Sequence, residues 1–281
     1  MEYERIRTHR RGRAGRTVSA DVLFTQDVGA GPAVVMLAGF GLDRRIWDGQ
    51  VEALARTHRV VCVDLLGTGG SPKPLDGYST TEQADLVLAA LDHLGVGEFA
   101  LVGHSFGGMV AFAVAAIVPS RVRKLILVGS NGVRAGRSAS FPFGAPGEKL
   151  LPLLVDTERR DRAAGRRRTL AAGFAEEPDR ATLDHLVAIS MTMPSWSAIP
   201  TLENMYRTDQ LAMIPLLPMP VCFLVGELDR VHPSTGALWL QTQLRSATVE
   251  IVPAAGHYLM LENPDAFNAL LRRELTTPSE R

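Results

Sequence analysis

The chain has 281 residues, of which 46% are hydrophobic and 21% are charged. This composition supplies enough apolar material for a substantial core, and it excludes collagen-like, disordered and small disulfide-stapled proteins. Thirty basic residues balance thirty acidic ones, so the net charge gives no reason to expect a nucleic-acid or anionic-membrane surface.

The N-terminal segment, residues 1–16, is basic but lacks the apolar stretch of a secretory signal, and Glu2 and Glu4 argue against a transit peptide. No apolar run in the sequence is long enough to cross a membrane. Cys62 and Cys222 both lie in apolar runs, not in a pattern of paired cysteines. We therefore expect a cytoplasmic protein with no membrane span and no nucleic-acid partner.

Short β-branched runs alternate with helical patterns along the chain. The predicted strands cover residues 18–25, 33–38, 60–64, 99–103, 125–129, 221–226 and 248–252. Several are continuous apolar runs, which are typical of parallel strands buried on both faces. The clearest helix begins with a capping box, Ser79 and Glu82, and ends at Gly95. The alternation predicts an α/β fold with a mostly parallel central sheet flanked by helices.

One long stretch interrupts this alternation. Residues 131–218 contain helical patterns, at 156–174 and 181–193, but no convincing strand. We interpret residues 131–218 as a helical cap inserted into a core formed by residues 1–130 and 219–281. The arginine-rich run at 158–168 is interpreted as a solvated helix face. Methionine and aromatic residues of the segment either line an adaptable apolar pocket or pack its interior; they are Met191, Met193, Trp196, Met205 and Tyr206.

A Gly-x-Ser-x-Gly motif, Gly103 to Gly107, joins the strand at 99–103 to a helical pattern. Such a context favours a sharp turn that lifts the Ser105 hydroxyl above the sheet, with glycines where larger side chains would collide. The alternative is that Ser105 only caps the helix that follows.

Two further strand ends carry polar residues, and the carboxyl ends of parallel strands are where sites form. Asp229 follows the strand at 221–226, with Glu227 as a rival acid and a turn-forming role as the alternative. His257 follows the last strand. The other histidines have less specific interpretations: His104 is the variable position of the motif, and His232 is among those in polar or helical surroundings.

Together these residues resemble the α/β-hydrolase superfamily over about residues 18–271, including the chain order serine, acid, histidine. The resemblance implies that Ser105 is the nucleophile and that His257 acts first as general base and then as general acid. It implies that Asp229 fixes the tautomer of the imidazole. Relatives that catalyse dehalogenation or epoxide hydrolysis have aspartate at this position. The serine therefore argues against those two reactions for this chain.

The loop after the second predicted strand is also similar to the family's oxyanion loop. The resemblance implies an oxyanion hole made by the backbone N–H groups of Phe40 and Phe106, with Trp47 as a pocket residue. Many relatives have histidine where this chain has Ala38, which leaves the hole intact because its donors are backbone groups. Gly67 and Gly69 follow a strand, as the first two glycines of a dinucleotide-binding motif do, but Pro72 occupies the place of the third glycine. The sequence therefore argues against dinucleotide binding.

The resemblance implies acyl chemistry on a small-molecule substrate, with no cofactor and no metal. Hydrolysis of an ester or lactone comes first, and carbon–carbon bond hydrolysis, acyl transfer and perhydrolysis remain alternatives on the same residues. A non-catalytic ligand receptor that retains the fold is the alternative from another class of protein. We expect a monomer or a homodimer.

Overall fold

The computed structural model describes residues 23–276. The basic segment 1–16 and the first part of the predicted strand at 18–25 lie outside the described residues. The strands are β1 (Thr25–Val28), β2 (Ala33–Leu37), β3 (Arg59–Val63), β4 (Phe99–His104), β5 (Val122–Val128), β6 (Val221–Gly226) and β7 (Ala247–Val252). Only β1 departs clearly from its predicted bounds, because its sequence Thr-Gln-Asp-Val is partly exposed and lacks the apolar pattern of a buried strand.

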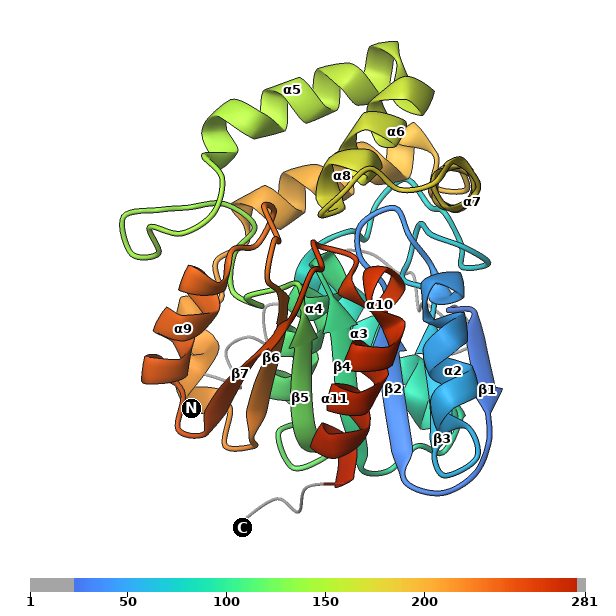
Figure 1. Ribbon diagram of the computed structural model, residues 1–281, viewed down its shortest axis with the longest axis vertical. Coiled ribbons are helices and arrows are strands. Elements are labelled where there is room, and N and C mark those ends of the chain that lie inside the picture. Colours follow the sequence, from blue (N-terminus) through green and yellow to red (C-terminus); the bar gives the residue numbers. More distant parts are fainter. Residues whose placement is uncertain (1–22, 277–281) are drawn as a thin grey trace, which may run out of the picture.

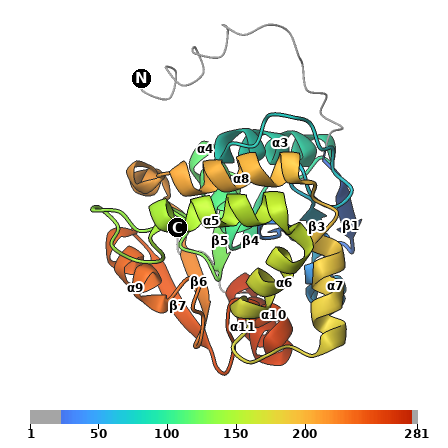
Figure 2. The same cartoon turned by 90° about the horizontal axis from the view of Figure 1, so that it is seen from above.

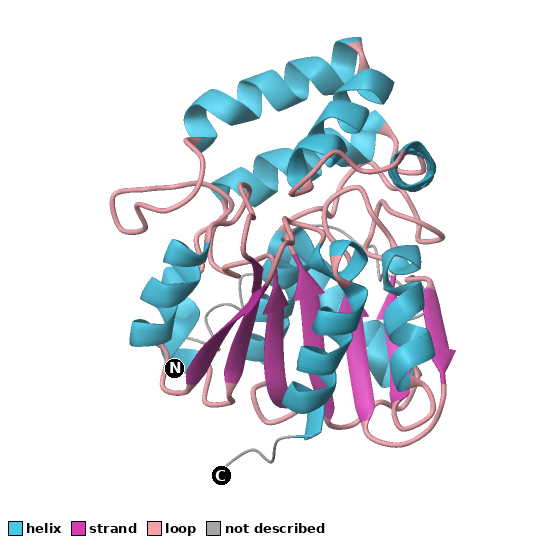
Figure 3. Ribbon diagram, in the orientation of Figure 1, coloured by secondary structure: helices cyan, strands magenta, loops and turns pink. Residues whose placement is uncertain are grey.

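The strands form one seven-stranded sheet in the order β1-β3-β2-β4-β5-β6-β7 (Figure 3). β1 pairs with β3 in the antiparallel sense, and all other neighbours are parallel. The predicted α/β class with a mostly parallel sheet is therefore confirmed. Because the parallel strands all end at one edge, β4, β5, β6 and β7 bring the segments that follow them to the same side of the molecule.

Helices cover both faces of the sheet (Figure 1). They are α2 (Asp48–Leu54), α3 (Thr80–His93), α4 (Phe106–Ile117), α9 (Ser234–Gln243), α10 (Leu259–Glu262) and α11 (Pro264–Thr276), with the 3-10 helix η2 (Arg44–Trp47) before α2. Alternate residues of β2 face opposite sides: Val35 packs in the core with α3, α4 and α9, and Val34 in the core with α2 and α11. The predicted capping box of Ser79 and Glu82 is present at the start of α3.

The segment between β5 and β6 is helical and lies over the carboxyl edge of the sheet (Figures 1 and 2). It contains α5 (Gly147–Arg160), α6 (Arg162–Gly173), α7 (Arg180–Ser190), α8 (Ser195–Arg207) and the 3-10 helix η3 (Leu211–Leu216). The single helical pattern predicted at 156–174 is two helices. They separate at Asp161, whose side chain accepts a hydrogen bond from the Ala164 N–H and so caps α6.

Within residues 23–276, no helix has the length and apolar character needed to span a bilayer.

Candidate active site

The Gly-x-Ser-x-Gly motif forms a tight turn between β4 and α4. Ser105 has φ 52° and ψ −118°, a backbone conformation that a residue with a side chain rarely adopts and that costs about 1–3 kcal/mol. A Cβ atom at Gly107 would lie 2.4 Å from the Ala38 carbonyl oxygen, and one at Gly103 would lie 2.5 Å from the Gly107 carbonyl oxygen. Only glycine fits at both positions, so these two glycines permit the turn that raises Ser105 above the sheet.

The structure brings Ser105, His257 and Asp229 together in one chain of hydrogen bonds. The Ser105 Oγ atom lies 2.9 Å from His257 Nε2, and His257 Nδ1 lies 3.0 Å from Asp229 Oδ2. Within the described chain, the Ser105 side chain makes no capping hydrogen bond to α4, so the alternative of a simple helix cap is wrong. The arrangement can pass the serine proton to the imidazole and hold the opposite ring nitrogen in its protonated form.

Asp229 is buried at the end of β6 and has both carboxylate oxygens engaged. Oδ1 accepts hydrogen bonds from the backbone N–H groups of Val231 (2.8 Å) and His232 (2.9 Å), which leaves Oδ2 for His257. Burial opposes ionisation of Asp229, but the attraction and hydrogen bond of His257 outweigh it, so the pKa of the carboxyl is lowered. A negative Asp229 is the form that orients an imidazole and stabilises its charged state.

The backbone of His257 is fixed on both sides. Its N–H donates to the Gly173 carbonyl at the end of α6 (2.7 Å), and its carbonyl oxygen accepts from His104 Nε2 (3.0 Å). Burial lowers the pKa of His104 well below its usual value, so His104 is neutral and donates from Nε2. His104 and His232, which the sequence analysis did not select, both line the cavity beside Ser105. His104 precedes Ser105 in the motif, but its contact with the His257 carbonyl and the position of His232 both depend on distant segments coming together.

The two residues predicted to form the oxyanion hole both line the cavity. Phe40 follows β2 and Phe106 is the first residue of α4, and both line the cavity together with Ser105. The Phe106 N–H is at the start of a helix and has no acceptor within that helix. An oxyanion hole needs two such N–H groups directed at the reacting carbonyl oxygen.

A cavity of about 570 Å³ extends from Ser105 to the helices above the sheet. Its lining is mostly apolar and includes Phe40, Met109, Leu150, Leu154, Leu170 and Leu202. Of the predicted pocket residues on the helical segment, Met205 and Tyr206 of α8 line this cavity. Met191 and Met193 do not, because they lie in the turn between α7 and α8.

The two predicted pocket tryptophans also lie outside the lining. Trp47 is fully buried beneath the site, stacked on Phe267 at 6.4 Å and edge-on to His104. Trp196 is 55% exposed, and its indole N–H donates to the Lys73 carbonyl 3.1 Å away. The prediction that Trp47, Met191, Met193 and Trp196 line the pocket is thus corrected: a helical segment has several apolar sides, and composition does not tell which of them meets the cavity.

A buried ion pair lies in the cavity wall. Arg166 of α6 donates from Nε and Nη2 to the two carboxylate oxygens of Glu158 on α5, at 3.0 and 2.7 Å. It also donates to the Ser190 carbonyl of α7, and Ser195 of α8 donates to Glu158 (3.0 Å). This corrects the interpretation of 158–168 as a solvated face, because these two side chains are buried where the four helices meet. Burial lowers the pKa of Arg166.

This chain is similar to known proteins in both sequence and fold. Residues 32–264 match the model of the α/β-hydrolase fold family. The chain is 31% identical to a pimeloyl-[acyl-carrier protein] methyl ester esterase of Nitrosomonas europaea, over 87% of this chain and 96% of that protein. It is 31% identical to a 2-hydroxymuconate semialdehyde hydrolase of Pseudomonas putida, over 79% of this chain and 78% of that protein.

Solved structures agree on the fold. An esterase from Exiguobacterium antarcticum superimposes with a TM-score of 0.87 at 23% identity, over 91% of this chain and 96% of that chain. A bromoperoxidase from Bacillus anthracis gives a TM-score of 0.86 at 21% identity, over 91% and 95%. With the family match over residues 32–264, these likenesses lead to one conclusion: the chain belongs to the α/β-hydrolase fold family.

Proposed function

We propose that the protein is a serine hydrolase that cleaves a small to medium, largely apolar carboxylic ester or lactone through an acyl-enzyme. The observation that carries this proposal is the hydrogen-bonded chain Ser105–His257–Asp229 at the base of an apolar cavity. The relatives named as a methyl ester esterase and a semialdehyde hydrolase support hydrolysis as the reaction type.

In the first half of the reaction, Ser105 Oγ attacks the substrate carbonyl carbon while His257 Nε2 takes the hydroxyl proton. The carbonyl oxygen becomes an oxyanion that accepts hydrogen bonds from the backbone N–H groups of Phe40 and Phe106. His257 then gives its proton to the leaving alcohol oxygen as the carbon–oxygen bond breaks. Asp229, whose pKa is lowered by its contact with His257 despite burial, stays ionised and stabilises the imidazolium.

In the second half, a water molecule attacks the acyl-enzyme carbonyl and gives a proton to His257 Nε2. The same two N–H groups hold the second oxyanion. When it collapses, the bond to Ser105 Oγ breaks, His257 returns the proton to the serine, and the carboxylic acid leaves. No proton is gained or lost by the enzyme over the cycle.

Residues 131–218 act in this proposal as a cap that shapes the substrate cavity. Support comes from the lining, to which α5, α6 and α8 contribute Leu150, Leu170 and Met205 opposite Ser105. Two arginines belong to the lining: Arg166 is buried and paired with Glu158, and Arg230 is exposed at the protein surface. Because the rest of the lining is mostly apolar, it favours a substrate whose buried part is uncharged.

A panel of p-nitrophenyl esters of increasing acyl length tests the proposal. The wild-type enzyme should hydrolyse part of the series, and Ser105→Ala should lower kcat/KM by several powers of ten while the fold remains intact. Ser140→Ala is the matched control, because Ser140 is exposed and its hydroxyl contacts the Ser138 hydroxyl, away from the cavity lining. A serine-directed phosphonate should label Ser105 alone.

Each other outcome has a distinct meaning. An active Ser105→Ala variant, or labelling at another serine, would overturn the nucleophile. Phosphonate labelling of Ser105 without any ester turnover would favour carbon–carbon bond hydrolysis, acyl transfer or perhydrolysis on the same residues. The absence of both labelling and turnover would favour a ligand receptor.

A further inference from the structure

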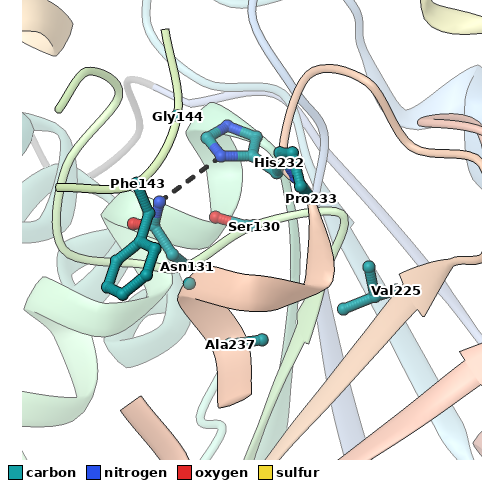
Figure 4. Close-up of a pocket in the computed structure, with 9 residues that line it drawn as sticks. Ser130, Asn131, Phe143, Gly144, Val225, His232, Pro233 and Ala237 are labelled. Carbon is teal, nitrogen blue, oxygen red and sulfur yellow. Dashed lines mark hydrogen bonds between the residues drawn. The ribbon is translucent and has the colours of Figure 1, made fainter. Parts of the chain in front are cut away.

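Asn131 is hydrogen-bonded to the ring of His232, which lines both the cavity beside Ser105 and the smaller pocket drawn in Figure 4. The Asn131 Oδ1 atom accepts hydrogen bonds from the backbone N–H groups of Val133 and Arg134, both at 2.9 Å. This fixes which way the amide points, because the oxygen must face those two donors. The Nδ2 amino group then faces His232 Nδ1, 3.4 Å away.

The amide orientation determines the tautomer of His232. An amino group only donates, so Nδ1 of the imidazole must accept and carries no proton. The proton of the neutral ring is therefore on Nε2. Burial, followed by the proximity of His257, lowers the pKa of His232 to about 4, so the ring is neutral near pH 7 and has one N–H to offer.

The Nε2–H group is free for a ligand. Nδ1 is turned toward Asn131, so Nε2 is on the edge of the ring away from that residue (Figure 4). No residue between 23 and 276 makes a hydrogen bond to Nε2, and His232 lines the same cavity as Ser105. The ring centroids of His232 and His257 are 5.7 Å apart.

The proximity to His257 identifies which part of the substrate His232 meets. His257 has to deliver a proton to the leaving alcohol oxygen, so the alcohol part of the ester must lie beside its ring. His232 is a donor beside His257 in the lining of the same cavity. The lining of the cavity as a whole is mostly apolar, and Arg230 beside His232 is exposed, so the neutral N–H of His232 acts as an orienting group next to His257.

We propose that His232 is a specificity-determining residue that donates its Nε2–H to a neutral oxygen acceptor, an ether, carbonyl or hydroxyl oxygen, in the alcohol part of the ester. The inference rests on the proposed ester hydrolysis and names its substrate class. Asn131 is the positioning residue that keeps the donor on Nε2.

Two substrates that differ in one atom test it: butyl butanoate and 2-methoxyethyl butanoate, in which an ether oxygen replaces one methylene. The measured quantity is the ratio of their kcat/KM values, methoxyethyl over butyl, followed by acid release. In His232→Met this ratio should fall about three- to tenfold, the range for one neutral hydrogen bond. His232→Gln, of similar length but with an amide N–H, should restore most of the ratio.

A ratio that is the same in wild type and His232→Met would overturn the inference while leaving ester hydrolysis intact. An enzyme inactive on both esters would overturn the proposed function and this inference together. A second pair, p-nitrophenyl pentanoate and 3-methoxypropanoate, places the ether oxygen on the acyl side. A response of this pair instead would overturn the assignment to the alcohol side.

The tautomer is tested without any turnover. The ¹⁵N shifts of the wild-type His232 ring, identified by their loss in His232→Gln, should show a protonated Nε2 and an unprotonated Nδ1 near pH 7. A ring protonated on Nδ1 alone would overturn the inference even if the His232→Met variant did not fold.

Discussion

Asp229 and Glu227 are two residues apart, yet their carboxylates hold different partners. Asp229 Oδ2 faces His257 Nδ1 at 3.0 Å, whereas Glu227 Oε2 accepts from the backbone N–H of Ala254 at 3.0 Å. The turn after β6 separates them, since the Asp229 N–H bonds to the Gly226 carbonyl. Asp229 is therefore buried at the site, and Glu227 ties down the loop that leads to His257.

This separation predicts very different effects of two isosteric substitutions. Asp229→Asn should keep the shape of the site but leave His257 in the wrong tautomer, lowering kcat on the order of 10⁴-fold. Glu227→Gln keeps an oxygen that can accept from Ala254 and should cost far less. Steady-state kinetics of both variants with one activated ester measures the difference, and the opposite ranking would assign the acid role to Glu227.

The sequence predicted some residues of this site and missed others. Gly103 is required by backbone contacts within the strand–turn–helix unit, and Gly107 by the close approach of the end of β2 at Ala38. Both glycines belong to one local motif, so the sequence predicted the turn. Asp229 and Glu227 both follow β6, and only the turn, together with the return of His257 from a later strand, distinguishes them. His232 was passed over because its partner Asn131 is about a hundred residues away, and no local pattern encodes that contact.

The lowered pKa of His232 makes the stability of the protein depend on pH. The unfolded chain binds a proton near pH 6.5 and the folded chain only near pH 4. Acid therefore favours the unfolded state. The contribution of His232 to the free energy of unfolding is fully present above pH 6.5 and is lost as the pH falls toward 4. The loss amounts to up to about 3 kcal/mol.

His232→Gln removes this titration. The free energy of unfolding of wild type, measured against that of His232→Gln from pH 7 to pH 4, should decrease progressively and level off below pH 4. The lowered pKa of His104 is present in both proteins, so its effect cancels in the difference. A difference that is constant with pH would show that His232 titrates alike in the folded and unfolded chains.

The buried pair of Arg166 and Glu158 predicts a strongly non-additive pair of substitutions. Glu158→Gln leaves a buried guanidinium without its counter-charge, which should lower the free energy of unfolding by about 3–5 kcal/mol. The double variant Glu158→Leu with Arg166→Met removes both charges and should cost much less. Arg160 and Asp156 form an exposed pair on the same helix, and Asp156→Asn should change stability by less than about 1 kcal/mol.

Denaturant unfolding of the three variants measures these differences. Equal losses for the single and double variants would mean that the pair stabilises the four helices through its other hydrogen bonds, to Ser190 and from Ser195. The pair was not predictable from the sequence because Arg166 belongs to a run of arginines that looks solvated throughout. The break between α5 and α6 at Asp161 turns this one arginine inward.

The last prediction concerns which side chains set the length of the substrate. Tyr206 lines the cavity and is half-buried, and its partial burial raises the pKa of its hydroxyl to about 12. Tyr206→Ala should enlarge the cavity and shift the preference toward longer acyl chains, because one methylene of apolar contact is worth roughly 1–3 kcal/mol of discrimination. Trp196→Ala is the control, since this tryptophan is on the same helix but 55% exposed. The ratio of kcat/KM between a long and a short p-nitrophenyl ester, beside the melting temperature, separates the two effects. A ratio that moved in Trp196→Ala but not in Tyr206→Ala would contradict the cavity as the acyl-binding site and assign substrate length to the outer surface of α8.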